Sequence, residues 1–332
     1  MKVKRTYTTI FYLLVLAGAA GMLVLLSGCF ALLSGCTIPS PWYLSPSLEL
    51  QTIPAENKTL LSPYLRTVHQ FKGQLHCHSR ASDGSGTSEE VVDAYKNAGY
   101  DFLCLTDHSH VTPDPGVEGI LFIPGVEESP VYGHILGVGI TRKTNALQFA
   151  AIIQFIQSQG GLAFYCHPNS EQGYGWTQDE LFCAPFANGL EVLNGNSVAE
   201  DKWDALLSAG WMTWGIGTDD LHHIPGDLGQ SWVMVNADSL TPDDIIHSLR
   251  NGNFYTTQGP DLNIDVSGGT ITASTSEPST FHWIGWKGTT LRETSGINND
   301  TYHLQGNEKY IRLKVQRERD HKLAFSQPVF VE

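Results

Sequence analysis

Residues 73–84 have the sequence GQLHCHSRASDG, which places two histidines two positions apart at the end of a strand-like apolar run. Residues i and i+2 of an extended chain point to the same face, so His76 and His78 share one space and Cys77 points away. Asp83 follows in the next turn. Two imidazoles and a carboxylate on one rim suit a divalent transition metal, although this stretch alone is equally consistent with a pair of histidines that binds none.

The composition is that of a globular protein with a substantial core. The chain has 332 residues, of which 41% are hydrophobic and 16% charged, enough for one large domain and a small one. The net charge is −14, with a pI near 5.3, and no basic stretch follows the first five residues. This balance argues against nucleic-acid binding. It does not exclude a small phosphorylated substrate, because bound metals invert the local charge.

The first 36 residues have the features of an export signal. Basic residues precede an apolar run over 10–26, and the sequence LSGC then occurs twice, at 26–29 and 33–36. Both copies resemble the bacterial lipoprotein signal, which makes Cys29 and Cys36 candidates for lipidation. An uncleaved membrane anchor is the alternative, because the apolar stretch is long enough to span a bilayer. Either way, we expect the body of the protein outside the cytoplasmic membrane, tethered in the cell envelope.

Three further regions follow this leader. Residues 37–70 are rich in Pro, Ser and Leu, which suits a linker or a segment wrapped over the domain. Residues 71–259 alternate short apolar strands with amphipathic helices, a pattern that predicts parallel pairing in an α/β barrel or open sheet. Residues 260–332 alternate polar and apolar residues between turns and predict a small antiparallel β-sandwich.

The candidate metal ligands fall at the C-terminal end of an expected strand or just beyond it. In a barrel those ends share one face, where catalytic groups gather, so we expect the candidates to meet there. They are His76, His78, His108, Glu127, His134, His167, Asp220 and His222.

Four cysteines of the same domain lie in or beside apolar segments: Cys77, Cys104, Cys166 and Cys183. We expect small buried side chains rather than ligands or a disulfide framework, although an exported protein could pair two of them. Cys77 and Cys166 each adjoin a histidine and should face the opposite side of their strand.

The ordered motifs resemble the polymerase and histidinol phosphatase (PHP) superfamily over about residues 71–258. They are His76-x-His78, Asp83-Gly84, Thr106-Asp107-His108, Gly125-Val126-Glu127, His134, His167-Pro168 and Asp220-x-His222. The resemblance implies a distorted (β/α)7 barrel that binds two or three divalent metals in a cleft. The closing sequence NGNFYTTQGP at 251–260, with the β-rich tail, is similar to the branch that includes carbamate-insecticide hydrolases.

The resemblance also implies a division of ligands among the ions. One ion would be held by His76, His78, Glu127 and Asp220. Glu127 would bridge to a second ion held by His134 and His167, and a third would be held by Asp83, His108 and His222. Nitrogen and oxygen ligands without thiolate fit zinc, manganese or iron.

Such ions lower the pKa of a bound water from about 16 toward 7, and the hydroxide attacks phosphorus or a carbonyl carbon. Asp220 or His222 would carry a proton to the leaving group. Arg80 is a candidate contact for a substrate phosphate or carboxylate. Asp107 and Asp219 adjoin ligands, and each is expected to orient a histidine through a hydrogen bond to the ring nitrogen that does not bind metal.

Three functions therefore compete. We favour a membrane-tethered metallohydrolase that acts on a small phosphate monoester or diester. Because the motifs have few Lys and Arg nearby, a carboxylic or carbamate ester is the alternative substrate. The third hypothesis is a non-catalytic, metal-stabilised surface protein that binds a glycan or partner through its tail. Glu191 lies at a strand end where the family usually has no ligand, and we expect a structural or supporting role for it. The sequence does not specify an oligomeric state.

Overall fold

The computed structural model describes residues 48–65, 67, 69–130, 132–183 and 186–332. The expected leader, with Cys29 and Cys36, lies outside these residues. Within the part of the chain that is described, no helix combines the length and the apolar character needed to cross a bilayer.

Seven short strands form a closed ring. Each strand pairs with the next in chain order. A parallel bridge between Cys77 and Leu221 returns the last strand to the first. The α/β barrel expected from the sequence is therefore confirmed. Its strands are β3 (His69–Gln74), β4 (Phe102–Leu105), β5 (Leu121–Glu128), β6 (Ile135–Val138), β7 (Leu162–Tyr165), β8 (Gly189–Asn194) and β10 (Trp214–Thr218).

The barrel is distorted because β6 runs antiparallel to both β5 and β7. The expectation of parallel pairing throughout is wrong here, since the connection from β5 to β6 is a short hairpin rather than a crossover helix. His134 consequently precedes β6 instead of following a strand. The reversed direction of β6 still brings its first residue to the edge where β5 and β7 end.

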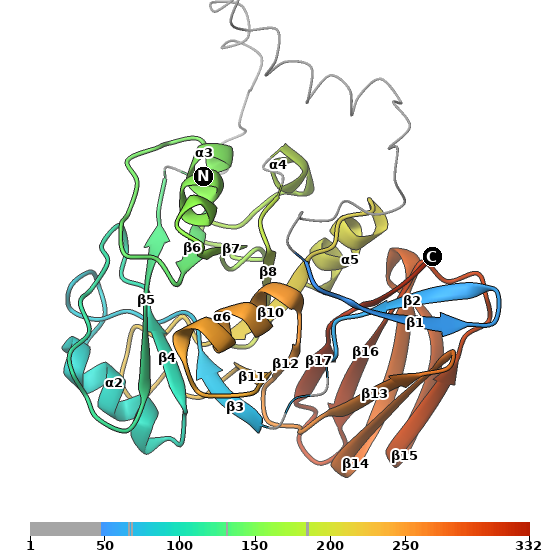
Figure 1. Cartoon of the computed structure of the whole chain (residues 1–332). Coiled ribbons are helices and arrows are strands. Elements are labelled where there is room, and N and C mark those ends of the chain that lie inside the picture. The colour runs from blue at the N-terminus through green and yellow to red at the C-terminus, as the bar shows by residue number, and fades with distance from the viewer. Residues whose placement is uncertain (1–47, 66, 68, 131, 184–185) are drawn as a thin grey trace, which may run out of the picture. The chain divides into compact units, whose positions relative to one another are not determined.

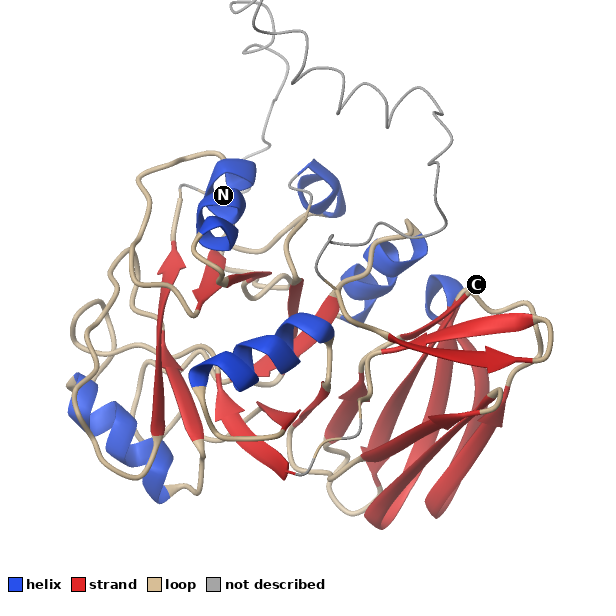
Figure 2. Ribbon diagram, in the orientation of Figure 1, coloured by secondary structure: helices blue, strands red, loops and turns tan. Residues whose placement is uncertain are grey.

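Helices lie around the strands of the barrel (Figure 2). Helix α2 begins at a capping box formed by Thr87 and Glu90, and α6 begins at Thr241 and ends at Gly252, whose φ of 75° suits a residue without Cβ. Helix α4 was not expected from the sequence. The helices are α2 (Ser88–Asn97), α3 (Phe149–Ser158), α4 (Gln178–Cys183), α5 (Glu200–Ser208) and α6 (Pro242–Asn251).

The barrel sheet continues into the tail. Strand β11 (Trp232–Ala237) pairs antiparallel with β3 and with β12 (Phe254–Thr257), and β12 pairs in turn with β17 (Leu323–Ser326). Helix α6 connects β11 to β12 along the chain. The boundary near residue 259 is thus crossed by main-chain hydrogen bonds.

The tail is an antiparallel sandwich, as expected, with its own apolar core around Phe281 and Leu313 (Figure 1). Part of the expected linker belongs to it: the hairpin of β1 (Gln51–Ala55) and β2 (Lys58–Ser62) pairs with β18. The remaining elements are β9 (Ser197–Val198), β13 (Asn263–Ser267), β14 (Thr270–Gly285), η1 (Trp286–Gly288), β15 (Thr289–His303), β16 (Tyr310–Arg317) and β18 (Val329–Val331).

A buried ion pair joins the tail to α5. The Arg312 side chain on β16 is fully buried, and its Nε donates to Asp204 Oδ1 at 2.9 Å. The Nη2 atom of Arg312 also lies 3.0 Å from a Glu200 carboxylate oxygen. Removing one partner of such a pair leaves a buried charge without a counterion. The free-energy cost of this change exceeds the net stabilisation that the intact pair provides.

We expect Arg312→Met to lower the free energy of unfolding by about 3 kcal/mol, because Asp204 would remain buried without its cation. Urea denaturation of the full chain measures this. Arg319→Ala is the control, since that side chain is 62% exposed; its loss should cost less than about 1 kcal/mol. Equal effects from the two variants would contradict a stabilising junction.

Candidate metal centre

Four ligand-type atoms from the ends of three strands, β3, β5 and β10, meet in one shell. The His76 and His78 Nε2 atoms are 3.1 Å apart. Glu127 Oε2 lies 3.2 Å from the first and 3.3 Å from the second. Asp220 Oδ1 lies 3.3 Å and 3.2 Å from the same two nitrogens. The structure thus brings together the four side chains that the resemblance assigned to one ion.

The spacing of this shell fits a metal ion. A tetrahedral ion about 2.0 Å from each ligand would separate neighbouring ligand atoms by about 3.3 Å. Moreover, the buried Glu127 Oε2 has no hydrogen-bond partner, although it faces imidazole nitrogens. A bound cation would satisfy that oxygen and explain why the Nε2 atoms of His76 and His78 face one point.

Glu127 also joins this shell to a second group. Its other oxygen, Oε1, lies 2.7 Å from His134 Nδ1 and 3.0 Å from His167 Nε2. His108 Nδ1 approaches Oε2 at 2.9 Å. A carboxylate whose two oxygens face separate sets of imidazoles can bridge two cations.

A third group opens toward solvent. Asp83 Oδ2 lies 3.5 Å from the Nε2 atoms of both His108 and His222, and the Asp83 side chain is 53% exposed. The His78 and His222 rings stack with centroids 4.3 Å apart. His222 Nδ1 donates to the Asp220 carbonyl at 2.8 Å, so its Nε2 is the atom available to a ligand or proton. All nine side chains in the expected set therefore lie in three adjoining groups.

Two of these residues have unusual backbone angles. His167 and Asp220 have φ values of 29° and 52°, a region that side chains with a Cβ rarely occupy. Main-chain bonds hold Asp220 in place, since its N–H donates to the His76 carbonyl at 3.1 Å. The positive φ angles direct both side chains into the site.

The turn at His167 also corrects an expectation about Cys166. Cys77 does face away from the histidines, in a separate apolar cluster. Cys166 does not: its sulfur lies within 4.8 Å of ligand-type atoms of Glu127 and His167. The positive φ of His167 breaks the strand alternation that predicted opposite faces. Burial and the nearby carboxylates raise the pKa of the Cys166 thiol well above its usual value.

Asp107 and Asp219 do not orient a histidine, contrary to expectation. Asp107 accepts hydrogen bonds from Ser79 and Ser82 and so braces the loop that carries Asp83. Asp219 accepts from Tyr95 and from the main chain at 229–231. These aspartates follow their strands on the face opposite the ligands, so they stabilise the loops around the site instead.

Glu191 is the carboxylate that orients a ligand. His76 Nδ1 donates to Glu191 Oε1 at 2.6 Å, which leaves His76 Nε2 free to face the shell. The signal in the sequence was the same one that marked the ligands, namely an acid near the end of a barrel strand.

The ionisation states of the acids and histidines in the site depend strongly on one another. Burial alone would raise the pKa of Glu127, but the surrounding imidazoles hold it well below its usual range. Burial alone would lower the pKa of His78, but its contacts with the carboxylates of Asp220 and Glu127 outweigh burial and raise that pKa to about 9. The acids therefore stay ionised in the absence of metal, and His78 carries a proton at neutral pH.

Two cations lie near the site but have partners elsewhere. Arg80 Nε donates to the Ser85 carbonyl at 2.8 Å, and its guanidinium lies 3.8 Å from Glu90. Lys202 Nζ donates to the Pro168 carbonyl at 2.5 Å. The Tyr174 ring forms part of the rim, 45% exposed and 4.9 Å from the His134 ring.

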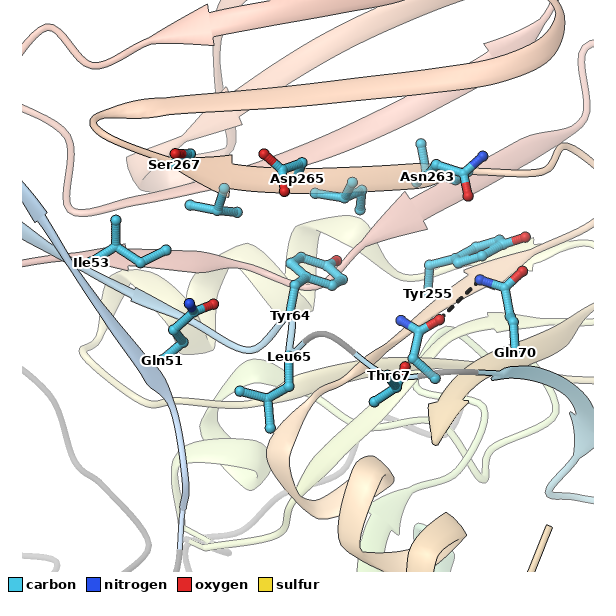
Figure 3. A pocket seen from close by; sticks show the side chains of 14 residues that line it. Gln51, Ile53, Tyr64, Leu65, Thr67, Gln70, Tyr255, Asn263, Asp265 and Ser267 are labelled. Atoms are coloured by element: carbon cyan, nitrogen blue, oxygen red, sulfur yellow. Dashed lines mark hydrogen bonds between the residues drawn. The ribbon is translucent and has the colours of Figure 1, made fainter. Parts of the chain in front are cut away.

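A separate cavity of about 360 Å³ lies between β1 and β13, lined in part by Tyr64, Tyr255 and Asp265 (Figure 3). None of its described lining residues is a histidine, a cysteine or a member of the ligand set. The chemistry of the metal groups therefore belongs to the barrel face alone.

No protein-family model matches the chain. A curated relative, the 3′,5′-nucleoside bisphosphate phosphatase of Chromobacterium violaceum, is 39% identical over 83 residues. That match spans 22% of this chain and 29% of the relative's length.

Two solved structures are similar to the chain. One is a two-domain protein from Bacteroides vulgatus containing a predicted PHP-like metal-dependent phosphoesterase. It is 17% identical, with 86% of this chain and 100% of that chain covered and a TM-score of 0.48. The other is an amidohydrolase from Chromobacterium violaceum with bound sulfate and no metal. It is 20% identical, with 47% and 89% covered and a TM-score of 0.36. The description of the first structure names the superfamily that the motifs at residues 71–258 resemble, whereas the similarity to the carbamate-hydrolase branch stays a prediction.

Metal binding should strengthen as pH rises. In the metal-free protein His78 has a pKa of about 9, so below that pH an ion must displace a proton. Apparent affinity for zinc should rise about tenfold per pH unit for each proton released, and level off above about pH 9. Competition titration with a chelator at several pH values measures this, and a flat profile from pH 6 to 8 would contradict it.

We expect Gly84→Ala to damage the group around Asp83. A Cβ at Gly84 would lie 2.3 Å from the His78 carbonyl oxygen, so the loop must move. The expected cost is about 1–3 kcal/mol of stability, together with weaker binding of the ion proposed for the group of Asp83, His108 and His222. Gly226→Ala is the control, because its nearest neighbour would be 3.8 Å away. Indistinguishable metal titrations for these two variants would count against the assignment.

Proposed function

We propose that the chain is a metal-dependent hydrolase that uses two or three divalent ions, zinc, manganese or iron, to cleave a phosphate monoester or diester of a small molecule. The observation that carries the proposal is the shell of His76, His78, Glu127 and Asp220, with its tetrahedral spacing and its unpartnered Glu127 oxygen. The partial match to a bisphosphate phosphatase supports a phosphate ester.

We assign the ligands as the resemblance implies. His76, His78, Glu127 and Asp220 would hold one ion. Glu127 would share a second with His134 and His167, and Asp83, His108 and His222 would hold the third. When bound, such ions supply an acidified water and offset negative charge on the ester oxygens.

Asp220 and His222 have the positions needed for proton transfer. Asp220 presents Oδ1 to the shell, while Oδ2 accepts from Asn194 Nδ2 at 3.2 Å and lies beside the cleft. Burial would raise the Asp220 pKa, but His76 and His78 hold it below its usual range, so the group stays ionised. With two ions bound, His222 Nε2 is free to pass a proton to the leaving group; with three it becomes a ligand.

A carboxylic or carbamate ester is the second candidate substrate. The observation that favours it is that two cations near the ligands, Arg80 and Lys202, both donate to main-chain carbonyls. Without a guanidinium aimed into the cleft, a doubly charged phosphate must rely on the ions alone, whereas a neutral ester has no such need. Arg80 remains our candidate for a substrate contact, through rotation of its 62% exposed side chain.

We also propose that the protein is exported and tethered to the membrane through Cys29, Cys36 or an uncleaved helix. Support for this comes only from the sequence of residues 1–36. A tethered enzyme of this kind would meet its small-molecule substrate in the cell envelope.

Turnover should depend on the proposed ligands and not on histidines elsewhere. We expect His76→Ala and Asp220→Ala to abolish hydrolysis of the best substrate among p-nitrophenyl phosphate, bis-p-nitrophenyl phosphate and a naphthyl carbamate, with manganese or zinc added. His247→Ala is the control, because that half-exposed ring lies on α6. Full activity in Asp220→Ala would refute the site. Metal binding without turnover of any ester would favour the non-catalytic binding protein.

A further inference from the structure

Glu191 lies at the centre of a saturated hydrogen-bond network behind the metal groups. Its side chain is fully buried in the middle of β8. Oε1 accepts from His76 Nδ1 at 2.6 Å and from Thr218 Oγ1 at 2.7 Å. Oε2 accepts from Asn194 Nδ2 at 2.8 Å and from the main-chain N–H of His167.

This saturation separates Glu191 from the ligands. An ionised carboxylate has about four lone-pair sites, and four donors occupy them here. Glu191 lies close enough to His76 and Cys166 to form a group of metal-ligand type. Binding an ion there would require it to release a donor that is itself buried, at a cost of about 1–3 kcal/mol.

We propose that Glu191 is a positioning residue that sets two ligands of different ions at once. It fixes the His76 side chain, because a proton held on Nδ1 leaves the Nε2 lone pair directed at the shell. It fixes His167 through the main chain, because its Oε2 holds the N–H of a residue whose φ is 29°. The inference rests on the metal assignment of the proposed function and not on the substrate.

Only a carboxylate can accept hydrogen bonds from all four of these donors. A glutamine at the position would turn an N–H₂ group toward one pair of donors. Directed at His167 and Asn194, it would oppose two N–H groups. Directed at His76, it would force the imidazole to accept at Nδ1 and carry its proton on Nε2, where the ion binds. Both orientations weaken the metal groups, although the side chain has nearly the same size.

The test is Glu191→Gln in the full-length chain, titrated with zinc against a competing chelator and with cobalt to record the absorption of the bound ion. We expect zinc affinity to fall about 10- to 100-fold with the number of bound ions unchanged, and the cobalt spectrum to shift. Loss of one whole ion at saturating metal would instead make Glu191 a ligand and overturn the proposal.

The matched control is Glu308→Gln. Glu308 is also a buried carboxylate in a network, accepting from Tyr302 Oη at 2.7 Å and from the main-chain N–H groups of Gln305 and Gly306 at 2.7 and 2.8 Å. It lies in the tail, so its loss should lower thermal stability and leave metal affinity as in the wild type. An equal loss of affinity in both variants would mean that general destabilisation explains the effect.

Two outcomes separate this inference from the proposed function. If the wild type binds no metal, the proposed function fails. If the wild type binds metal and Glu191→Gln binds it equally well, only this inference fails. Should Glu191→Gln not fold, Glu191→Asp keeps the charge but withdraws both oxygens by one methylene, and the same loss of affinity is expected; unchanged affinity would again refute the positioning role.

Discussion

The structure depends on a buried carboxylate, Glu127, surrounded by imidazoles. Taking such a charge out of water costs several kcal/mol unless it is paired. His134 and His167 approach one oxygen, and His76, His78 and His108 approach the other. The five histidines adjoin four strands of the ring, β3, β4, β6 and β7, so this interaction requires the barrel edge to close. Cations in the same space would supply the compensation that the imidazoles provide only in part.

The barrel achieves this closure by departing from regular geometry at the same places where ligands are needed. β3 and β10 meet through main-chain bonds at His76, His78 and Asp220 rather than through a long ladder. β6 reverses direction, and His167 and Asp220 take up positive φ. The surrounding hydrogen bonds hold these points in place, among them the one that Glu191 accepts from the main-chain N–H of His167. A regular parallel barrel would aim fewer side chains at one point.

The tail is structurally part of the barrel domain rather than an appended module. β12 pairs with strands of both regions, and Arg312 extends from the sandwich to two acids of α5. α5 itself follows β8, which carries Glu191. The tail is therefore connected through α5 and β12 to the region of the barrel that carries the ligands.

The sequence by itself determined which residues could be ligands and on which edge they would lie, because the two-residue spacing of His76 and His78 and the strand-end positions of the others depend only on local geometry. It also determined the helices whose caps are local, such as the one that begins after Thr87. Only the tertiary structure decided the reversed direction of β6 after His134, the turn of Cys166 toward the site, and the pairing of β2 with the last strand. It likewise decided that Glu191, rather than Asp107 or Asp219, supports a histidine. The physical reason is that strand direction, backbone strain and long-range hydrogen bonds are set by partners distant in the chain, and a local pattern carries no record of them.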